Sequence, residues 1–218
     1  MNKRFEVLDA FRGLCALSVV VFHMRFVDSI TELKFFMGSG LFVEFFFVLS
    51  GFVLAHGYGF KYDLKFKAFM KARFFRLYPL HFVMFIFVII FNIIKLLAGK
   101  YLGVSFSSEA FTGMNTVSGI IPNLLLIHSW TPFTEPYSFN GPSWSISIEF
   151  YMYALLFASI ALFKSNRIIS WFIISLMAFT LILLESKLLV TEVLSGLSCF
   201  FGGAFTYVIY KKTAHFKP

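Results

Sequence analysis

Two ionisable side chains within one apolar stretch constrain this chain more than any other feature. Arg12 and His23 lie eleven positions apart in LDAFRGLCALSVVVFHM, which begins at Leu8. An α-helix turns by about 100° per residue, so this spacing places both side chains near the same face, roughly 16 Å apart along the axis. A guanidinium or an imidazole in hydrocarbon is costly, and such groups usually face a polar cavity where they have a function. The sequence therefore predicts chemistry inside a membrane.

The composition also predicts a membrane protein. Hydrophobic residues make up 59% of the 218 residues, Phe alone occurs 33 times, and charged residues make up only 14%. This is too little polar content for an ordinary soluble fold. We expect an all-α polytopic membrane helix bundle that forms one domain over residues 1–218. Its six candidate spans are Leu8–Val27, Phe35–Phe60, Leu77–Ile94, Pro136–Phe163, Ile168–Leu184 and Val193–Tyr210.

The basic residues predict how the chain is oriented. A net charge of +8 could indicate nucleic acid as a partner, but the basic side chains lie in short loops between apolar stretches, as the positive-inside rule describes. The predicted cytoplasmic side chains are Lys3, Arg4, Lys61, Lys65, Lys67, Lys71, Arg73, Arg76, Lys164, Arg167, Lys211 and Lys212. Both termini are then cytoplasmic, provided that Val117–Trp130, which is too short to span, is re-entrant or interfacial. We expect membrane lipid as a partner and no nucleic acid.

Asp9, Arg12 and His23 in the first candidate span could act together. Asp9 and Arg12 are one helical turn apart, so they can pair at the cytoplasmic end of the span. Arg12 could equally be a topological anchor whose head group reaches the interface. His23 is expected deeper, toward the far side, where a lone histidine is either a hydrogen-bonded packing residue or a functional group.

The second candidate span, GSGLFVEFFFVLSGFVLAHGY, places Glu44 among aromatic residues. A carboxylate in such surroundings is either protonated or paired with a cation or donor from another helix, such as His23 or Arg12. Ser50 and Gly51 in the same span would allow a neighbouring helix to approach closely.

Two arginines mark the loop that follows. In KARFFRLYPLHF, Arg73 and Arg76 are three apart and would share one face of a short interfacial helix. Pro79 disfavours helix at the residue before it, so we expect a boundary there between the interfacial helix and the third span. Paired arginines can hold topology, contact anionic lipid, or bind phosphate groups through bidentate contacts, and composition does not choose among these uses.

The stretch NGPSWSISIEFYMY carries a polar stripe. Asn-Gly-Pro predicts a turn, and Ser143 is placed to cap a helix that starts near Trp144. Ser145, Glu149 and Tyr153 then recur at four-residue spacing on one helix face. The stripe could be a structural polar network between helices. A glutamate near a buried histidine is also the coupled pair that general acid–base catalysis uses.

Four motifs in a fixed order carry a family resemblance. LDAFRG with the Arg-x10-His spacing, FVEFFFVLSGF, RFFRLYP and PSWSISIEFYMY together resemble the membrane-bound acyltransferase 3 family, which includes bacterial O-antigen, peptidoglycan and nodulation-factor O-acetylases. The resemblance covers about residues 7–160. It implies a multi-pass protein of the bacterial cytoplasmic membrane. It also implies transfer of an acyl group, usually acetyl, from cytoplasmic acyl-CoA to a hydroxyl of an extracytoplasmic carbohydrate or lipid-linked glycan.

The resemblance also implies roles for individual residues. His23 matches the family's catalytic histidine, Arg12 its partner arginine, and Arg73 with Arg76 the pair thought to hold the CoA phosphates. We expect His23 to act as a general base or to form an acyl-histidine, and Glu149 or Glu44 to stabilise its protonated form. The supporting polar network comprises Asp9, Glu44, Trp144, Ser145 and Tyr153. Acyl-CoA is the expected donor substrate, with no permanently bound cofactor and no metal.

Two departures from the family pattern leave a second interpretation open. The family usually has Asp where this chain has Glu44, and about ten spans where we count about six. We therefore expect a short or truncated member that corresponds to the N-terminal part of the usual domain. The alternative is a catalytically incomplete membrane protein, a transporter or scaffold, that keeps the family's helix core.

The sequence does not identify the acceptor. Tyr101, Trp130, Phe133 and Tyr137 lie in the segment predicted to be outside the cytoplasm. Their rings could stack on a sugar, although aromatic residues at such positions more often anchor a protein at the membrane interface.

Overall fold

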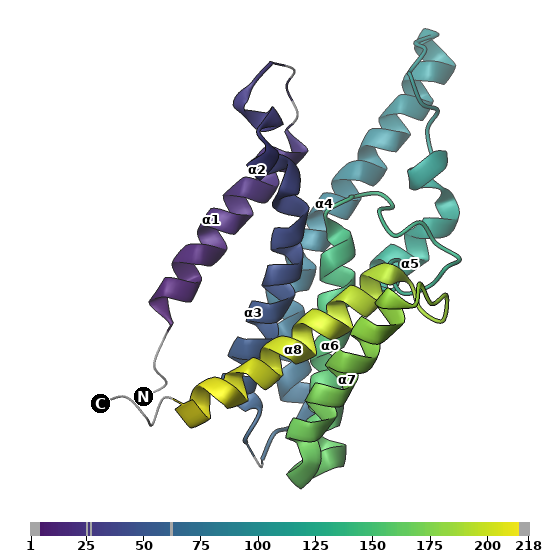
Figure 1. Cartoon of the computed structure of the whole chain (residues 1–218). Coiled ribbons are helices and arrows are strands. Elements are labelled where there is room, and N and C mark those ends of the chain that lie inside the picture. Colours follow the sequence, from purple (N-terminus) through teal and green to yellow (C-terminus); the bar gives the residue numbers. More distant parts are fainter. Residues whose placement is uncertain (1–4, 25, 27, 62, 214–218) are drawn as a thin grey trace. The chain divides into compact units, whose positions relative to one another are not determined.

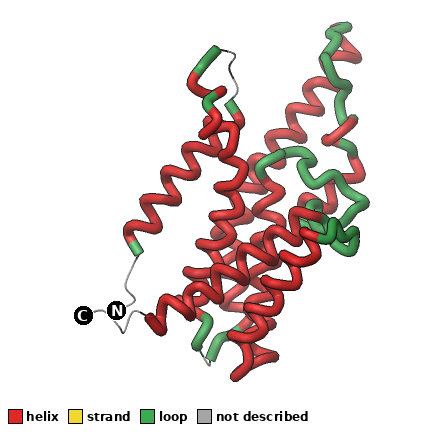
Figure 2. Tube along the Cα trace, in the orientation of Figure 1, coloured by secondary structure: helices red, strands yellow, loops and turns green. Residues whose placement is uncertain are grey.

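A computed structural model describes residues 5–24, 26, 28–61 and 63–213, and these residues form helices and no strand (Figures 1 and 2). The α-helices are α1 (Glu6–His23), α2 (Lys34–Met37), α3 (Leu41–Tyr58), α4 (Phe66–Leu102), α5 (Ile120–Leu124), α6 (Ser143–Phe163), α7 (Arg167–Leu183) and α8 (Thr191–Thr213). Short 3-10 helices are η1 (Ile30–Glu32), η2 (Gly38–Gly40), η3 (Gly113–Asn115), η4 (Val117–Gly119) and η5 (Lys164–Asn166). The all-α prediction is confirmed. Lys3 and Arg4, used to orient the N-terminus, lie outside the described residues.

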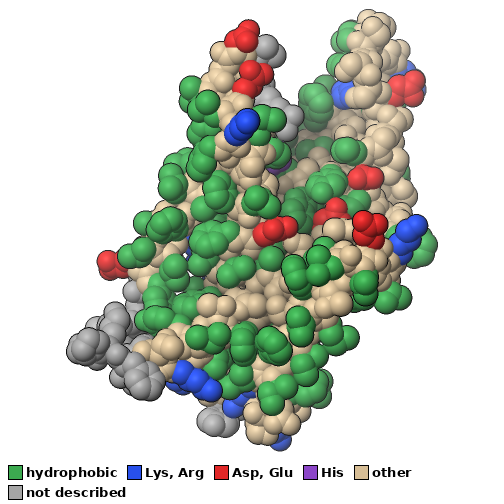
Figure 3. Space-filling view, in the orientation of Figure 1, with side chains coloured by type: hydrophobic (Ala, Val, Ile, Leu, Met, Phe, Trp, Pro, Cys, Tyr) green, Lys and Arg blue, Asp and Glu red, His purple; other side chains and the backbone are tan. Residues whose placement is uncertain are grey.

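Four helical stretches of the described chain are long and apolar enough to cross a membrane. They are Lys34–Tyr58, Phe66–Leu102, Ser143–Leu183 and Thr191–Thr213. Hydrophobic side chains are spread over the surface seen in Figure 3. Many large apolar side chains, such as Phe87, are exposed, as lipid-facing side chains are. The predicted first span does form helix α1, but Glu6, Asp9 and Arg12 place three charges in its 18 residues. The count of six spans and the cytoplasmic termini stay predictions.

The stretch Ser143–Leu183 is two helices and not one. Trp171 Nε1 donates a hydrogen bond to Ser159 Oγ at 2.8 Å, although twelve residues of continuous α-helix would separate them by about 18 Å. The chain turns back through η5, where Lys164 has a positive φ of 30°. The separate spans predicted over Pro136–Phe163 and Ile168–Leu184 therefore correspond to α6 and α7.

The chain divides into two compact units, each assembled from distant segments. The first unit comprises Met1–Tyr62, Ser159–Thr180 and Ser195–Pro218, and the second comprises Asp63–Ala158 and Leu181–Leu194. The first unit thus holds α1 to α3 with most of α7 and α8, and the second holds α4, α5 and most of α6. A single domain over residues 1–218 stays a prediction.

In the first unit, α3 and α8 touch through their backbones. A Cβ atom added to Gly51 would overlap the carbonyl oxygen of Phe200, and one added to Gly203 would overlap the carbonyl oxygen of Val48. Small residues permit this contact, and close packing is a main source of attraction between helices in a membrane. The close helix approach predicted at Gly51 is confirmed.

Arg167, predicted to be a cytoplasmic loop charge, is buried. Its Nη1 atom donates to the Gly59 carbonyl at 2.9 Å, just after the last residue of α3, and its guanidinium lies 5.3 Å from the centre of the Phe60 ring. A cation at a helix C-terminus satisfies carbonyl groups that have no partner within the helix and interacts favourably with the helix dipole. Arg167 therefore also ties the start of α7 to the end of α3.

In the second unit, the predicted boundary at Pro79 is wrong. Helix α4 continues from Phe66 to Leu102 with Pro79 inside it. A proline removes one helical hydrogen bond, which neighbouring segments can offset in a membrane. Here the Tyr78 hydroxyl donates to the Leu124 carbonyl at 3.0 Å, and His81 Nε2 lies 2.9 Å from the Asn123 carbonyl oxygen. These contacts hold α4 against the end of α5 on both sides of the proline.

The segment Val117–Trp130 is not a span. It contains η4 and the five-residue α5, followed by turns. The carbonyls at the end of α5 accept the contacts from α4 just described. Helix α5 is too short to cross a membrane, as predicted, whereas a re-entrant or interfacial position of the segment stays a prediction.

We expect Gly51→Ala to destabilise the protein by about 1–3 kcal/mol, because the added methyl group forces α3 and α8 apart. This corresponds to a fall of several degrees, about 2–12 °C, in the thermal unfolding midpoint of the purified protein in detergent. Gly57→Ala is the matched control, since Gly57 lies on the same helix with open space around its Cβ position. Equal midpoints for the two variants would contradict the backbone contact.

Candidate active site

The predicted site residues divide between the two units. The first unit holds Asp9, Arg12, His23 and Glu44, and the second holds Arg73, Arg76, Trp144, Ser145, Glu149 and Tyr153. Stabilisation of protonated His23 by Glu149 or Glu44 stays a prediction.

Helix α1 carries Arg12 and His23 in one uninterrupted helix, so the predicted common face holds. Arg12 Nη1 lies 3.7 Å from Asp9 Oδ1, and the two side chains are 22% and 40% exposed. An ion pair with this exposure contributes less than about 1 kcal/mol, so it orients Arg12 more than it stabilises the fold. Cys15 and Ser18 form the buried side of α1, whereas His23, the last residue of the helix, is exposed.

Glu44 has a donor from another helix, as predicted, but the donor is Ser195 of α8 and not His23 or Arg12. The Ser195 hydroxyl donates to Glu44 Oε1 at 3.0 Å. Glu44 also lies in the first turn of α3, which begins at Leu41. The longer methylene chain of Glu44 is therefore accommodated by a local partner within the first unit.

Arg73 and Arg76 lie near the start of α4, three residues apart. The Arg73 guanidinium is 6.0 Å from the centre of the Phe69 ring and 5.9 Å from that of Tyr153, so it lies within range of aromatic faces on two helices. Arg73 is half-buried and Arg76 is exposed. Both positive charges act on the Tyr153 hydroxyl. The two arginines thus lie on a long helix and not on the short interfacial helix expected, and Arg73 faces α6.

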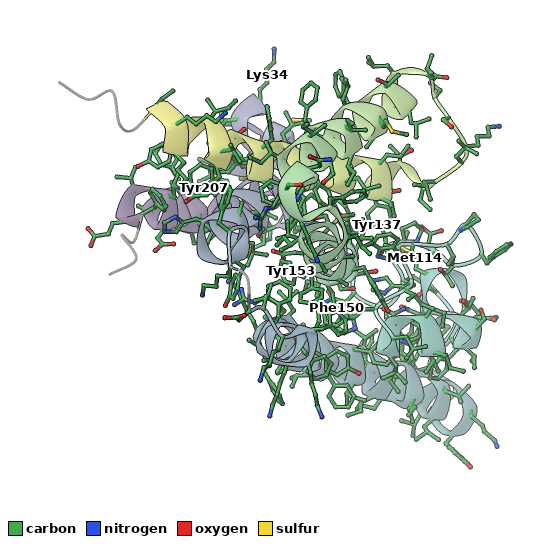
Figure 4. The ribbon with its side chains drawn as sticks, turned by 90° about the horizontal axis from the view of Figure 1, so that it is seen from below. Lys34, Met114, Tyr137, Phe150, Tyr153 and Tyr207 are labelled. Carbon is green, nitrogen blue, oxygen red and sulfur yellow. The ribbon has the colours of Figure 1, made fainter. Side chains whose placement is uncertain are left out.

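Helix α6 confirms most of the predicted polar stripe. The helix begins at Ser143, one residue before the predicted start. The Tyr153 hydroxyl, almost fully buried and labelled in Figure 4, donates a short hydrogen bond to Glu149 Oε1. Ser145 does not continue the stripe, because its hydroxyl donates to the Pro142 carbonyl at 3.1 Å. Glu149 and Tyr153 therefore form a local pair, four residues apart.

Arg73, Tyr153 and Glu149 form one chain of polar groups in the second unit. The cation lies over the phenol ring, and the phenol donates to the carboxylate. A hydrogen-bonded carboxylate with cations nearby can accept a proton or stabilise a cation that forms during a reaction. The exposed guanidinium of Arg76 can bind an anion such as a phosphate. Among the described residues no three His, Cys, Asp or Glu side chains gather as metal ligands.

The loop after α5 fixes α6 beside Glu149, which the sequence did not predict. The Ser147 hydroxyl donates to the Leu126 carbonyl at 2.6 Å, and Trp130 Nε1 donates to the Ser147 carbonyl at 3.1 Å. One turn further along α6, the Tyr151 hydroxyl donates to the Leu125 carbonyl at 2.8 Å. These bonds join two segments about twenty residues apart in sequence and hold α6 from the face opposite Glu149.

A buried histidine pair supports the same loop, and it too was missed. The rings of His81 and His128 are stacked with centres 5.9 Å apart and planes at 6°. Both side chains are buried, and His128 Nε2 lies 3.3 Å from the Ser143 hydroxyl at the start of α6. Burial, with a smaller contribution from the charge of His81, lowers the pKa of His128 to about 4. Each histidine stands alone in its stretch of sequence, so no spacing pattern connects the two. The sequence could only have drawn attention to each histidine separately.

The His128 pKa predicts a loss of stability in acid. The folded protein keeps His128 neutral down to about pH 4, whereas an unfolded chain protonates it near pH 6.5. Stability therefore falls as the pH drops from about 6.5 toward 4, by on the order of 3 kcal/mol. We expect His128→Gln to flatten the dependence of the unfolding midpoint on pH over this range. His23→Gln, which changes an exposed histidine, should keep the slope, and a slope unchanged in His128→Gln would contradict the prediction.

The fold and this cluster define the class of protein: a helical membrane protein with a partly buried acid–phenol pair and adjacent arginines. The family model for the acyltransferase domain matches residues 5–218, nearly the whole chain. The chain therefore belongs to the acyltransferase 3 family, as the resemblance predicted.

Curated relatives agree with this family. The chain is 34% identical over 168 residues to "Acyltransferase MdmB" of Streptomyces mycarofaciens, an alignment that covers 69% of this chain and 38% of the relative. It is 45% identical over 86 residues to "Protein 2 in picA locus" of Rhizobium radiobacter, covering 36% of this chain and 41% of that protein. The chain thus aligns with about two fifths of the length of each relative. No solved structure is similar enough to match this chain.

Proposed function

We propose that this chain is a membrane-bound O-acyltransferase of the bacterial cytoplasmic membrane. It transfers an acetyl group from acetyl-CoA to a hydroxyl of an extracytoplasmic carbohydrate or lipid-linked glycan. The observation that carries the proposal is the match of the acyltransferase domain to residues 5–218. The polar cluster of α4 and α6 supplies chemistry that suits it.

The donor binds at the start of α4. Arg73 and Arg76 contribute two guanidinium groups three residues apart on one helix, and a guanidinium makes the bidentate contacts that phosphate oxygens favour. The exposed lysines Lys67 and Lys71 add positive charge to the same turns of α4. In the predicted topology, with six spans and both termini inside, this end of α4 is cytoplasmic, where CoA is found.

The reaction moves one proton and one acyl group. Neutral His23 removes the proton of the acceptor hydroxyl as its oxygen attacks the thioester carbonyl, forming a C–O bond. The C–S bond then breaks, and the CoA thiolate takes the proton from His23. Glu149 or Glu44 stabilises the protonated histidine between these steps. In the alternative route the acyl group passes first to His23 and then to the hydroxyl.

The arginine pair provides the sharpest test. We expect Arg73→Lys/Arg76→Lys to raise the KM for acetyl-CoA at least about tenfold, because lysine keeps the charge and loses the bidentate fork. Acetyl transfer from radiolabelled acetyl-CoA to envelope glycans, in membranes that contain the full chain, measures this effect. Lys164→Ala/Lys212→Ala is the control, since it removes two exposed charges from predicted cytoplasmic loops. An unchanged KM in the arginine variant would show that the pair serves topology or lipid contact.

His23→Ala tests whether the chain is an enzyme at all. Transfer that is present with the intact chain and falls at least about a hundredfold in His23→Ala, at equal expression, supports the proposed mechanism. An intact chain that binds CoA without transfer would be a catalytically incomplete family member. An intact chain with neither transfer nor CoA binding would be a scaffold or transporter, and the proposal would be overturned.

We expect Tyr153→Phe to lower kcat about tenfold while the KM for acetyl-CoA stays within about twofold. The variant removes the hydrogen bond to Glu149 and keeps the aromatic ring beside Arg73. Glu149→Gln should lower kcat further, because it removes the negative charge itself. Tyr101→Phe is the control, since Tyr101 is exposed at the far end of α4. A normal kcat in both Tyr153→Phe and Glu149→Gln would assign the pair a purely structural role.

A further inference from the structure

The second unit contains a pocket lined by residues that have no role in the proposed reaction. Its volume is about 580 Å³, within the usual range for small-molecule sites. Trp130 and Pro132, from the loop after α5, form one part of the wall. The rest comes from residues between Leu181 and Leu194, which join the end of α7 to the start of α8. All of these residues belong to the second unit.

The lining combines an aromatic ring with groups that accept and donate hydrogen bonds. The polar side chains in the wall are those of Glu185, Ser186, Lys187, Thr191 and Glu192. Two carboxylates and one ammonium give these lining residues a net charge of −1, in a chain whose net charge is +8. The pocket is therefore locally acidic, which favours neutral ligands rich in hydroxyl groups over anionic ones.

Two of these groups are held in place before any ligand binds. The indole of Trp130 donates to the Ser147 carbonyl, and its ring packs edge-on against Tyr151 with centres 5.5 Å apart. The Tyr137 hydroxyl, on a residue labelled in Figure 4, donates to Glu192 Oε1 at 3.1 Å. Burial and the adjacent Glu192 charge raise the pKa of Tyr137, so it remains a donor at neutral pH. Preorganised groups lose less entropy on binding.

We propose that this pocket binds the sugar ring that accepts the acyl group, and that the sugar is neutral. The proposal rests on the proposed function. The ring lies against the Trp130 indole, where its C–H groups meet an aromatic surface. The carboxylates of Glu185 and Glu192 accept hydrogen bonds from its hydroxyl groups, and one further hydroxyl remains for the reaction.

The position of the pocket along α6 links it to the predicted chemistry. Trp130 is hydrogen-bonded to Ser147, which lies two residues before Glu149 in α6. Tyr153, which contacts Arg73, lies four residues after Glu149. At 1.5 Å and about 100° per residue, Ser147 and Tyr153 are about 9 Å apart along the helix axis and lie on different faces of α6, with Glu149 on the Tyr153 face. A sugar in the pocket therefore lies beside the helix segment that also meets the predicted donor site.

Saturation-transfer NMR on the purified full chain in detergent tests binding independently of turnover. The probes are the methyl glycosides of glucose, galactose, mannose and rhamnose, with methyl glucuronide as the anionic match of the glucoside. We expect a neutral glycoside to bind, and the glucuronide to bind at least about tenfold more weakly. Glu192→Gln should weaken the neutral sugar about tenfold and reduce the discrimination against the glucuronide. Trp130→Ala should abolish binding. The control is Glu109→Gln, which changes an exposed glutamate outside the pocket; it should change neither the affinity for the neutral sugar nor the discrimination against the glucuronide.

The outcomes separate this inference from the proposed function. Binding that none of the pocket variants changes, or the absence of binding by any neutral glycoside, overturns the pocket assignment. Acetyl transfer whose acceptor KM is unaffected by Glu192→Gln also overturns it and leaves the acyltransferase function intact. Sugar binding that depends on Trp130 and Glu192 in a chain without transfer supports the pocket and counts against the enzyme. Loss of binding in Trp130→Ala alone would be attributed to misfolding. The pocket assignment therefore requires that the isosteric Glu192→Gln variant also binds the neutral sugar more weakly.

Discussion

A polar group within an apolar helix bundle needs a partner from another part of the chain, and this constraint shapes both units. Water is scarce in such surroundings, so an unpaired carboxylate or carbonyl would cost several kcal/mol. Glu44 receives the Ser195 hydroxyl, Arg167 caps the end of α3, and the loop after α5 is bonded to α6. The helices are therefore positioned by their few polar residues as well as by apolar packing.

Features that depend on local periodicity were predictable from the sequence. The long helices, the shared helix of Arg12 and His23, the close approach at Gly51 and the Glu149–Tyr153 pair all follow from spacings of eleven residues or fewer. The error at Pro79 is of another kind. The local rule for proline was outweighed by two contacts from the end of α5, more than forty residues away.

The partners of the site residues could not be predicted for the same reason. Ser195 is 151 positions from Glu44, and no spacing in the sequence joins them. His81 and His128 stack across 47 positions, in stretches that look purely apolar or loop-like. The pocket beside Trp130 depends on the chain returning after α7, so the aromatic residues of the preceding loop did not reveal whether they anchor the protein or contact a ligand.

In the proposed function, helix α6 is the segment that lies next to both substrates. Its first turns are bonded to the loop that carries Trp130, and Tyr153 one to two turns later meets the arginine of α4. The basic end attracts the phosphates of a donor, while the acidic pocket disfavours the same anion and leaves room for a neutral acceptor. Glu149, held by Tyr153, lies on the face of α6 that meets Arg73. In the proposed function, this difference in charge would keep acyl-CoA out of the acceptor pocket.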